Sequence, residues 1–131
     1  MSRQTIHTEN APAAVGTYSQ AVKVTTGNSS MVYISGQIGL NPQTMQLAKG
    51  FEAQAKQVMD NIEAICKAAG GSLAEVVKFN VSLTDLADFD ALNELFVARL
   101  TEPYPARAAV QVAALPKGAV VEIESILFIE S

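Results

Sequence analysis

The chain has almost none of the side chains on which disulfide bridges, metal centres and nucleophilic triads depend. Its 131 residues include one cysteine, one histidine and no tryptophan. Cys66 has no second thiol to pair with, which excludes an intrachain disulfide and fits a reducing compartment. His7 is far from Cys66 in the sequence, so the chain has neither zinc-ligand spacing nor the groups of a Ser-His-Asp or Cys-His site. We expect Cys66 to be a small buried apolar residue.

Positive charge is also scarce. Nine basic residues against thirteen acidic ones give a formal net charge of −4, which disfavours both a nucleic-acid partner and an anionic membrane surface. No apolar run approaches the length of a membrane span, and residues 1–16 contain no apolar leader segment. We therefore expect a soluble, cytoplasmic protein without nucleic-acid or membrane partners.

The residues that are present have the composition of one globular domain. Hydrophobic residues make up 49% of the chain and charged residues 17%, so we expect a single domain over residues 1–131. Apolar residues at helical spacing predict helices over Phe51–Ala69 and Phe89–Leu100, and Gly70-Gly71 is a typical end for the first. Period-two alternation and turn residues predict strands. The predicted strands are Thr5–His7, Tyr18–Thr25, Met31–Ile34, Val76–Leu83, Ala106–Val112 and Val120–Ile129.

The order of these elements, β-β-β-α-β-α-β-β, is typical of the α+β class. It favours one mixed sheet with both helices packed on one face. The other face of such a sheet is bare in a monomer, so it must be polar or be buried in an oligomer. The element order is therefore a first indication of self-association.

The C-terminal stretch Pro105–Ile129 carries charges within two otherwise apolar or small-residue strands. If these strands pair as a hairpin about Leu115, Arg107 falls near Glu122, and a guanidinium and a carboxylate share one patch of sheet. A solvated cross-strand ion pair, worth at most about 1 kcal/mol, explains this pattern as well as a functional site does. Spacing alone favours the ion pair.

The same stretch follows a longer pattern of proline, arginine, hydrophobic and small residues that ends in a glutamate between two hydrophobic residues. Its positions are Pro105, Arg107, Val110, Ala113, Leu115 and Val121-Glu122-Ile123. The pattern resembles the signature of the RidA/YjgF family, the reactive-intermediate (enamine/imine) deaminases, and it selects Glu122 rather than Glu124. Further matches extend over nearly the whole chain: Glu9–Gly16, Tyr18–Gln20, Ser35–Gln37, Gly70–Ser72, Asp85–Phe89 and Asn93.

The resemblance implies a homotrimer of chorismate-mutase-like α+β subunits with sites between the subunits. It also implies hydrolysis of 2-aminoacrylate or 2-aminocrotonate, as enamine or imine, to a 2-oxo acid and ammonia without a cofactor or metal. By the same resemblance, Arg107 would hold the substrate carboxylate and Glu122 would handle the attacking water. The residues implied to line the pocket are Tyr18, Ser35, Gly36 and Asn93.

These roles suit the residue types. A guanidinium holds a planar carboxylate through two parallel hydrogen bonds. The imine carbon is already electrophilic, so Glu122 need only position a water and move protons, which burial would assist by raising its pKa. A backbone N–H at Ser35 or Gly36 would support charge on the tetrahedral intermediate.

Structural explanations compete for the lining residues. Tyr18 fits a strand aromatic with its hydroxyl at the rim, Ser35 and Gly36 fit a turn, and Asn93 fits a solvated helix position. Two other functions are also open. One is a non-catalytic trimer that binds 2-oxo acids through Arg107, and the other is an RNA-cleaving translation inhibitor, against which the net charge argues.

The chain departs from the family pattern at three places. Ala109 stands where many members have a cysteine, so chemistry with a thiol at that position is excluded. Thr17 stands where many members have a proline, and the connection between the second helix and the next strand, at Pro103, is short. The pocket rim is therefore expected to differ, while Arg107 and Glu122 are kept.

Overall fold

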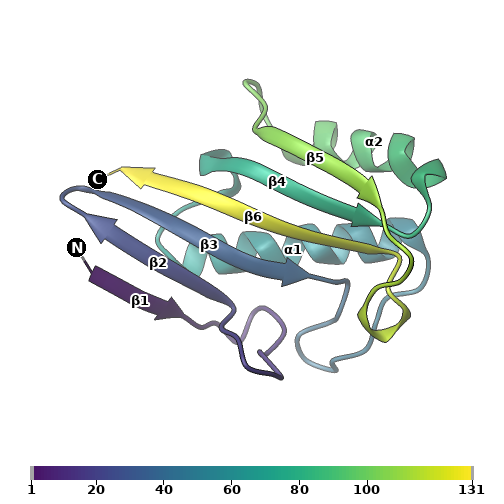
Figure 1. Cartoon of the computed structure of the whole chain (residues 1–131), viewed down its shortest axis with the longest axis horizontal. Helices are drawn as coiled ribbons and strands as arrows, with labels where there is room; N and C mark the ends of the chain where they lie inside the picture. The colour runs from purple at the N-terminus through teal and green to yellow at the C-terminus, as the bar shows by residue number, and fades with distance from the viewer. Residues whose placement is uncertain (1, 131) are drawn as a thin grey trace.

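Six strands form one sheet in this computed structural model, which describes residues 2–130 (Figure 1). The strands are β1 (Ser2–Ile6), β2 (Ala21–Thr26), β3 (Ser29–Gln37), β4 (Val76–Leu83), β5 (Ala106–Gln111) and β6 (Val121–Glu130). The helices are α1 (Phe51–Ala68) and α2 (Phe89–Arg99), with short 3-10 turns η1 (Leu73–Glu75), η2 (Leu86–Asp88) and η3 (Pro116–Gly118). The predicted order of elements is confirmed.

Two predicted strands, the first and the second, begin three residues away from their starts in the structure. β1 begins at Ser2 rather than Thr5, in an exposed stretch that pairs with β2 along one side only and so lacks an alternating pattern. β2 begins at Ala21 rather than Tyr18, because Gln20 is buried and uses its amide to hold the preceding loop instead of continuing the strand. Tyr18 is therefore a loop residue.

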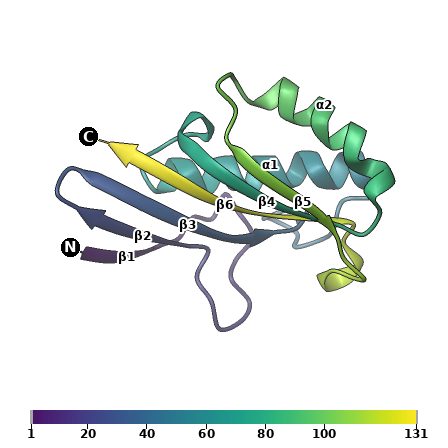
Figure 2. The ribbon, with the colours of Figure 1, turned by 45° about the horizontal axis from the view of Figure 1, so that its top comes forward.

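The sheet is mixed, as predicted, with strand order β1-β2-β3-β6-β4-β5. All neighbours are antiparallel except β4 and β5, which are parallel and are connected through α2. Both helices lie on the same face of the sheet, α1 behind its centre and α2 behind the β4–β5 edge (Figures 1 and 2). No helix within residues 2–130 is long and apolar enough to cross a membrane.

The predicted hairpin between the two C-terminal strands is wrong. β4 lies between β5 and β6, so Arg107 is opposite Phe79 of β4, whereas Glu122 is opposite Ser82. The reason is visible in β6, whose second face carries Ile126 in addition to the buried residues of its first face. From Ile126 to Ile129 this strand is apolar on both faces, which fits the centre of a sheet, where two neighbours shield it.

The core lies between the sheet and α1. The helix buries one stripe that includes Val58, Met59 and Ile62 at 0% exposure, and β4 adds Phe79, which contacts α2. Burial of each such side chain contributes roughly 1.5–3 kcal/mol. Cys66 belongs to the same stripe and is fully buried, which confirms the prediction of a structural thiol. Burial, followed by the negative charges of nearby glutamates, raises the pKa of Cys66 to about 12.

The predicted end of the first helix is confirmed. Gly70 has φ +94°, and its N–H donates to the carbonyl of Lys67, while the N–H of Gly71 donates to the carbonyl of Cys66. These two bonds form a Schellman motif, which satisfies the last carbonyls of α1 and needs a residue without a side chain at the left-handed position.

The face of the sheet opposite the helices is uncovered and largely apolar. Side chains on this face alternate with the buried ones on β2, β3 and β6, and they are half-buried or exposed. The apolar members are Val22, Val24, Met31, Tyr33, Ile126 and Phe128. Such a face is a candidate interface, because large contiguous apolar patches on soluble proteins usually mark contact sites.

Candidate active site

The residues predicted for the site fall into two clusters on opposite faces of the sheet. Arg107 is opposite Phe79, which faces the helices, so the arginine also points to the helix side. Glu122 alternates with the buried Val121 and Ile123, so it points to the uncovered side. We call Arg107 and Asn93 the arginine cluster, and Tyr18, Gly36 and Glu122 the glutamate cluster.

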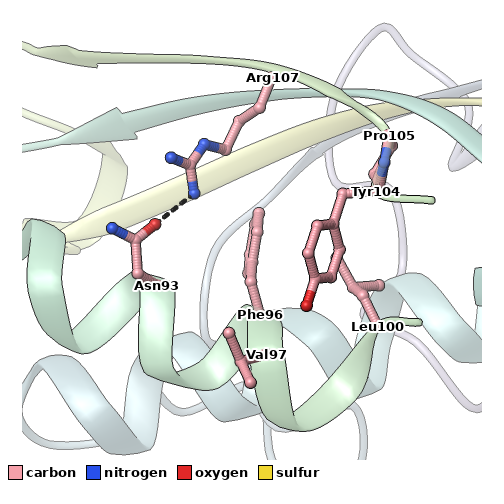
Figure 3. A pocket seen from close by; sticks show the side chains of 7 residues that line it. All are labelled: Asn93, Phe96, Val97, Leu100, Tyr104, Pro105 and Arg107. Carbon is pink, nitrogen blue, oxygen red and sulfur yellow. Dashed lines mark hydrogen bonds between the residues drawn. The ribbon is translucent and has the colours of Figure 1, made fainter. Parts of the chain in front are cut away.

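The arginine cluster is held by α2. The Nη1 of Arg107 donates to the Oδ1 of Asn93 at 2.6 Å (Figure 3). Its Cζ lies 5.0 Å from the ring centroid of Phe89 and 5.5 Å from that of Phe96. Phe89, Asn93 and Phe96 follow helical spacing on α2, so one helix face supplies all three contacts. Cation–π contacts and one hydrogen bond therefore fix the guanidinium in place.

The guanidinium keeps most of its binding capacity. Within residues 2–130 its one hydrogen bond is the bond to Asn93, and it forms no ion pair with any described carboxylate. The remaining N–H groups are available to a planar anion. This geometry excludes the cross-strand ion pair with Glu122, which the sequence left open, and it gives the half-buried Asn93 a partner in Arg107.

A cavity of about 380 Å³ opens beside the arginine cluster. Figure 3 shows Arg107 and Asn93 on one side of it, Tyr104 on the other, and Phe96 between them. Its lining residues are Asn93, Phe96, Val97, Leu100, Tyr104, Pro105 and Arg107. The cavity thus combines one cationic end with apolar walls, which suits a small amphipathic anion.

The glutamate cluster surrounds a smaller cavity of about 120 Å³, which Tyr18, Gly36, Lys117 and Glu122 help to line. Gly36 lies in a bulge of β3, where the register with β6 shifts between Ile34 and Gln37. A Cβ on Gly36 would lie 2.9 Å from the Cδ of Glu122. The carboxyl can therefore rest against the backbone of β3 only because residue 36 has no side chain.

The environment of Glu122 raises its pKa. Burial of the carboxyl is the main cause, and the negative charge of Glu124, on the same face of β6, is the second. Glu124 itself accepts a hydrogen bond from the Nδ2 of Asn80 at 3.1 Å. A carboxyl whose proton affinity is increased in this way is better suited to accept and return a proton than an ordinary glutamate.

Hydrogen bonds within the loop before β2 position Tyr18. The same loop accepts hydrogen bonds from the hydroxyl and the N–H of Ser35. The Oε1 of Gln20 accepts from the N–H of Thr8 at 2.7 Å, and its Nε2 donates to the carbonyls of Thr8, Ala11 and Pro12. The hydroxyl of Ser35 donates to the carbonyl of Ser19, and its N–H donates to the carbonyl of Gln20. Ser35 is not among the residues that line this cavity, and its contact with a substrate stays a prediction.

Sequence reasoning missed three contributors to these clusters. Phe89 and Phe96 lie within the second predicted helix, but nothing in the sequence indicated that they stack on Arg107. Gln20 stood within a matching segment without a role. An isolated glutamine before a strand does not indicate a structural role. The spacing of the aromatic residues on α2, by contrast, would have predicted a stacking surface for the guanidinium once Arg107 was placed opposite that helix.

The fold and the two clusters define a small α+β subunit with an available guanidinium on one face and a shielded carboxyl on the other. Among residues 2–130, no group of three or more histidine, cysteine, aspartate or glutamate residues is placed to hold a metal ion. Residues 8–129 match the family model described as Endoribonuclease L-PSP. The chain belongs to this family, the RidA/YjgF family.

Named relatives and solved structures agree with this assignment. The chain is 48% identical to human 2-iminobutanoate/2-iminopropanoate deaminase over 95% of this chain and 88% of that protein. The crystal structure of RidA from the Antarctic bacterium Psychrobacter sp. PAMC 21119 superposes with a TM-score of 0.89 at 74% identity and covers 96% of this chain and 99% of that chain. The structure of E. coli TdcF with bound serine has a TM-score of 0.86 at 40% identity, with 97% and 99% covered.

Proposed function

We propose that the chain is an enamine/imine deaminase that converts 2-aminoacrylate and 2-aminocrotonate, in their imine forms, to 2-oxo acids and ammonia. The observation that carries this proposal is the half-buried carboxyl of Glu122, whose pKa is raised and which lines a cavity with Tyr18. The name of the human relative supports the same reaction class. The activity would remove reactive metabolites in the cytoplasm, a compartment that also suits the free thiol of Cys66.

One chain does not bring Arg107 and Glu122 to the same substrate. The two residues are separated by β4, and their partners on that strand, Phe79 and Ser82, are three residues apart. Strand geometry puts them about 10 Å apart across the sheet and about 10 Å apart along it, and they point to opposite faces. The complete site therefore needs a second copy of the chain.

The assembly in this proposal is a homotrimer. The arginine cluster of one copy meets the glutamate cluster of the next, and three identical contacts close a ring. The uncovered apolar face of the sheet supports this arrangement, because it gives the copies a surface to bury. Each interface then holds one substrate between a guanidinium and a carboxyl.

In this site Arg107 binds the substrate carboxylate and Glu122 moves the protons. Glu122 accepts a proton from water as the oxygen attacks the imine carbon, and it returns that proton to the nitrogen of the resulting carbinolamine. Glu122 next takes the O–H proton of the carbinolamine and delivers it to the nitrogen, so that the C–N bond breaks, ammonia leaves and the carbonyl forms. The nitrogen, oxygen and protons balance without any redox partner.

A second candidate function is a non-catalytic binder of small carboxylates. The available guanidinium of Arg107 would serve such a protein as well, and the TdcF structure was solved with bound serine. A third is RNA cleavage, which the description of the family model names. Against it stand the net charge of −4 and the position of the single histidine, His7, outside the linings of both cavities.

The test is ammonia and 2-oxo acid release from an enamine that a dehydratase generates in situ. We expect release well above the rate of spontaneous hydrolysis, with equal amounts of the two products. A binder would leave the spontaneous rate unchanged. Incubation with structured and single-stranded RNA in parallel tests the third candidate, and RNA fragments without ammonia release would contradict the deaminase proposal.

A further inference from the structure

The cavity beside Arg107 is larger than the short side chains of the proposed substrates require. Its volume of about 380 Å³ falls within the range of roughly 300–1,000 Å³ that small-molecule sites occupy. An amino-acid-sized ligand anchored by its carboxylate at Arg107 and Asn93 would fill only the polar end. The rest of the cavity is lined by Phe96, Val97, Leu100 and Tyr104, together with Pro105.

We propose that this cavity is the subsite for the substrate side chain, and that it selects 2-imino acids with branched or aromatic apolar side chains over the methyl and ethyl ones. The inference rests on the proposed function, since it places the carboxylate at Arg107. The polar anchor and the apolar wall lie on the same cavity, with Phe96 between them (Figure 3). A ligand held at Arg107 therefore directs its side chain along α2 towards Tyr104.

The walls of the subsite differ in rigidity. Phe96 and Leu100 are 7% and 8% exposed and belong to the core, so they form a fixed floor. Val97 and Tyr104 are 65% and 51% exposed, so their apolar surface is in contact with water when the cavity is empty. Covering them with an apolar ligand group removes their surface from water, and this is the source of the selectivity.

Binding of non-reacting 2-oxo acids tests the subsite without catalysis. Calorimetry compares 2-oxobutanoate with 4-methyl-2-oxopentanoate and with 3-phenyl-2-oxopropanoate. Each buried methylene changes affinity about fourfold, so the two added carbons of 4-methyl-2-oxopentanoate should tighten binding about fifteenfold. Equal affinity for the short and branched acids would overturn the inference.

A cavity-filling variant locates the effect. Val97→Phe narrows the subsite from an exposed position and should reduce kcat/KM for the branched imine at least tenfold more than for 2-iminopropanoate. Leu86→Phe is the matched control, because Leu86 is also exposed, at 46%, but lies in η2 outside the cavity lining. This control should leave the ratio of the two kcat/KM values unchanged.

The outcomes separate this inference from the function on which it rests. No ammonia release from any imine would contradict the proposed function, whatever the binding series shows. Release from short imines with no change of ratio in Val97→Phe would overturn the subsite alone. If Val97→Phe changes the oligomeric mass but not the ratio of the two kcat/KM values, a second copy covers the cavity. That result would also contradict the proposed subsite.

Discussion

Replacing Glu122 by glutamine separates an enzyme from a binder. Glutamine keeps the size of the side chain and its place against Gly36, but it cannot accept a proton from water. If Glu122 is the general base, turnover should fall by about 10²–10⁴-fold. Binding of 2-oxobutanoate should change little, because Arg107 supplies the anchoring charge, and it should tighten slightly if Glu122 is ionised near the bound carboxylate.

The raised pKa of Glu122 predicts the direction of two further effects, one on the melting temperature and one on the pH dependence of kcat/KM. Because burial raises this pKa in the folded state, the ionised carboxyl costs stability as the pH rises above the ordinary range of a glutamate. Glu122→Gln should therefore melt at the same or a higher temperature than wild type at pH 7, so loss of turnover cannot be ascribed to unfolding. Since the ionised form is the base, wild-type kcat/KM should fall as the pH drops through the raised pKa.

Glu124 is the matched control for this experiment. It lies on the same face of β6 and bonds to Asn80, and its charge contributes to the raised pKa of Glu122. Glu124→Gln should keep nearly full turnover at neutral pH, with the acid limb of the profile moved to lower pH. Ammonia release is measured for wild type and both variants from pH 5 to 9. Equal losses in the two variants would refute a positioned base, and a loss confined to Glu124→Gln would assign the base to that residue.

Substitutions at two other positions probe the anchor, Arg107, and the close contact at Gly36. Arg107→Ala should lower kcat/KM by a hundredfold or more while the fold is kept, since each hydrogen bond to a charged group contributes about 1.5–3 kcal/mol. Arg107→Lys should also lose most of the activity, because an ammonium cannot form two parallel hydrogen bonds to the carboxylate. Wild-type rates in Arg107→Lys would show that this paired bonding is not required. Gly36→Ala should fold normally but lose about tenfold or more in turnover, because the new Cβ displaces the carboxyl of Glu122. Unchanged turnover there would mean that this carboxyl position is not the active one.

The sequence predicted the elements well but placed the two charged strands wrongly. Alternation assigns faces within a strand, and in β6 it separates the buried Val121 and Ile123 from Glu122 on the other face. It does not say which strands are neighbours, because strand order depends on the crossover through α2. The assumed hairpin therefore put Arg107 and Glu122 on one patch, although they face opposite ways.

The site itself was less predictable than the fold. Its residues were predicted from the family resemblance. The residue types alone did not indicate that these side chains act together. Asn93 had no signal as a helix residue until β5 placed Arg107 beside it at 2.6 Å. Ser35, which the resemblance places in the pocket, bonds to the loop through Ser19 and Gln20, and nothing in the sequence indicated these two bonds. Hydrogen-bond partners of this kind depend on tertiary contacts that no local pattern contains.

Mixing two inactive variants tests whether each site is shared between copies. Arg107→Ala chains keep Glu122, and Glu122→Gln chains keep Arg107, so an interface between one of each can carry both residues. In a ring with one site per interface, random mixing places the intact arginine against the intact glutamate at about a quarter of the sites. Equal amounts of the two proteins, unfolded and refolded together, should therefore recover about a quarter of wild-type turnover.

The assembled mass must be checked in the same samples. Analytical ultracentrifugation at low micromolar concentration should show trimers for the wild type, for each variant and for the mixture. Refolding each variant alone gives the baseline, which should stay inactive. Trimers of mixed composition without recovered turnover would place Arg107 and Glu122 in the same site of one chain, or in no common site. A fully active monomer would show that the site does not lie at an interface. Recovery near a quarter is possible only if the two faces of the sheet, which a single chain holds apart, meet across a contact between copies.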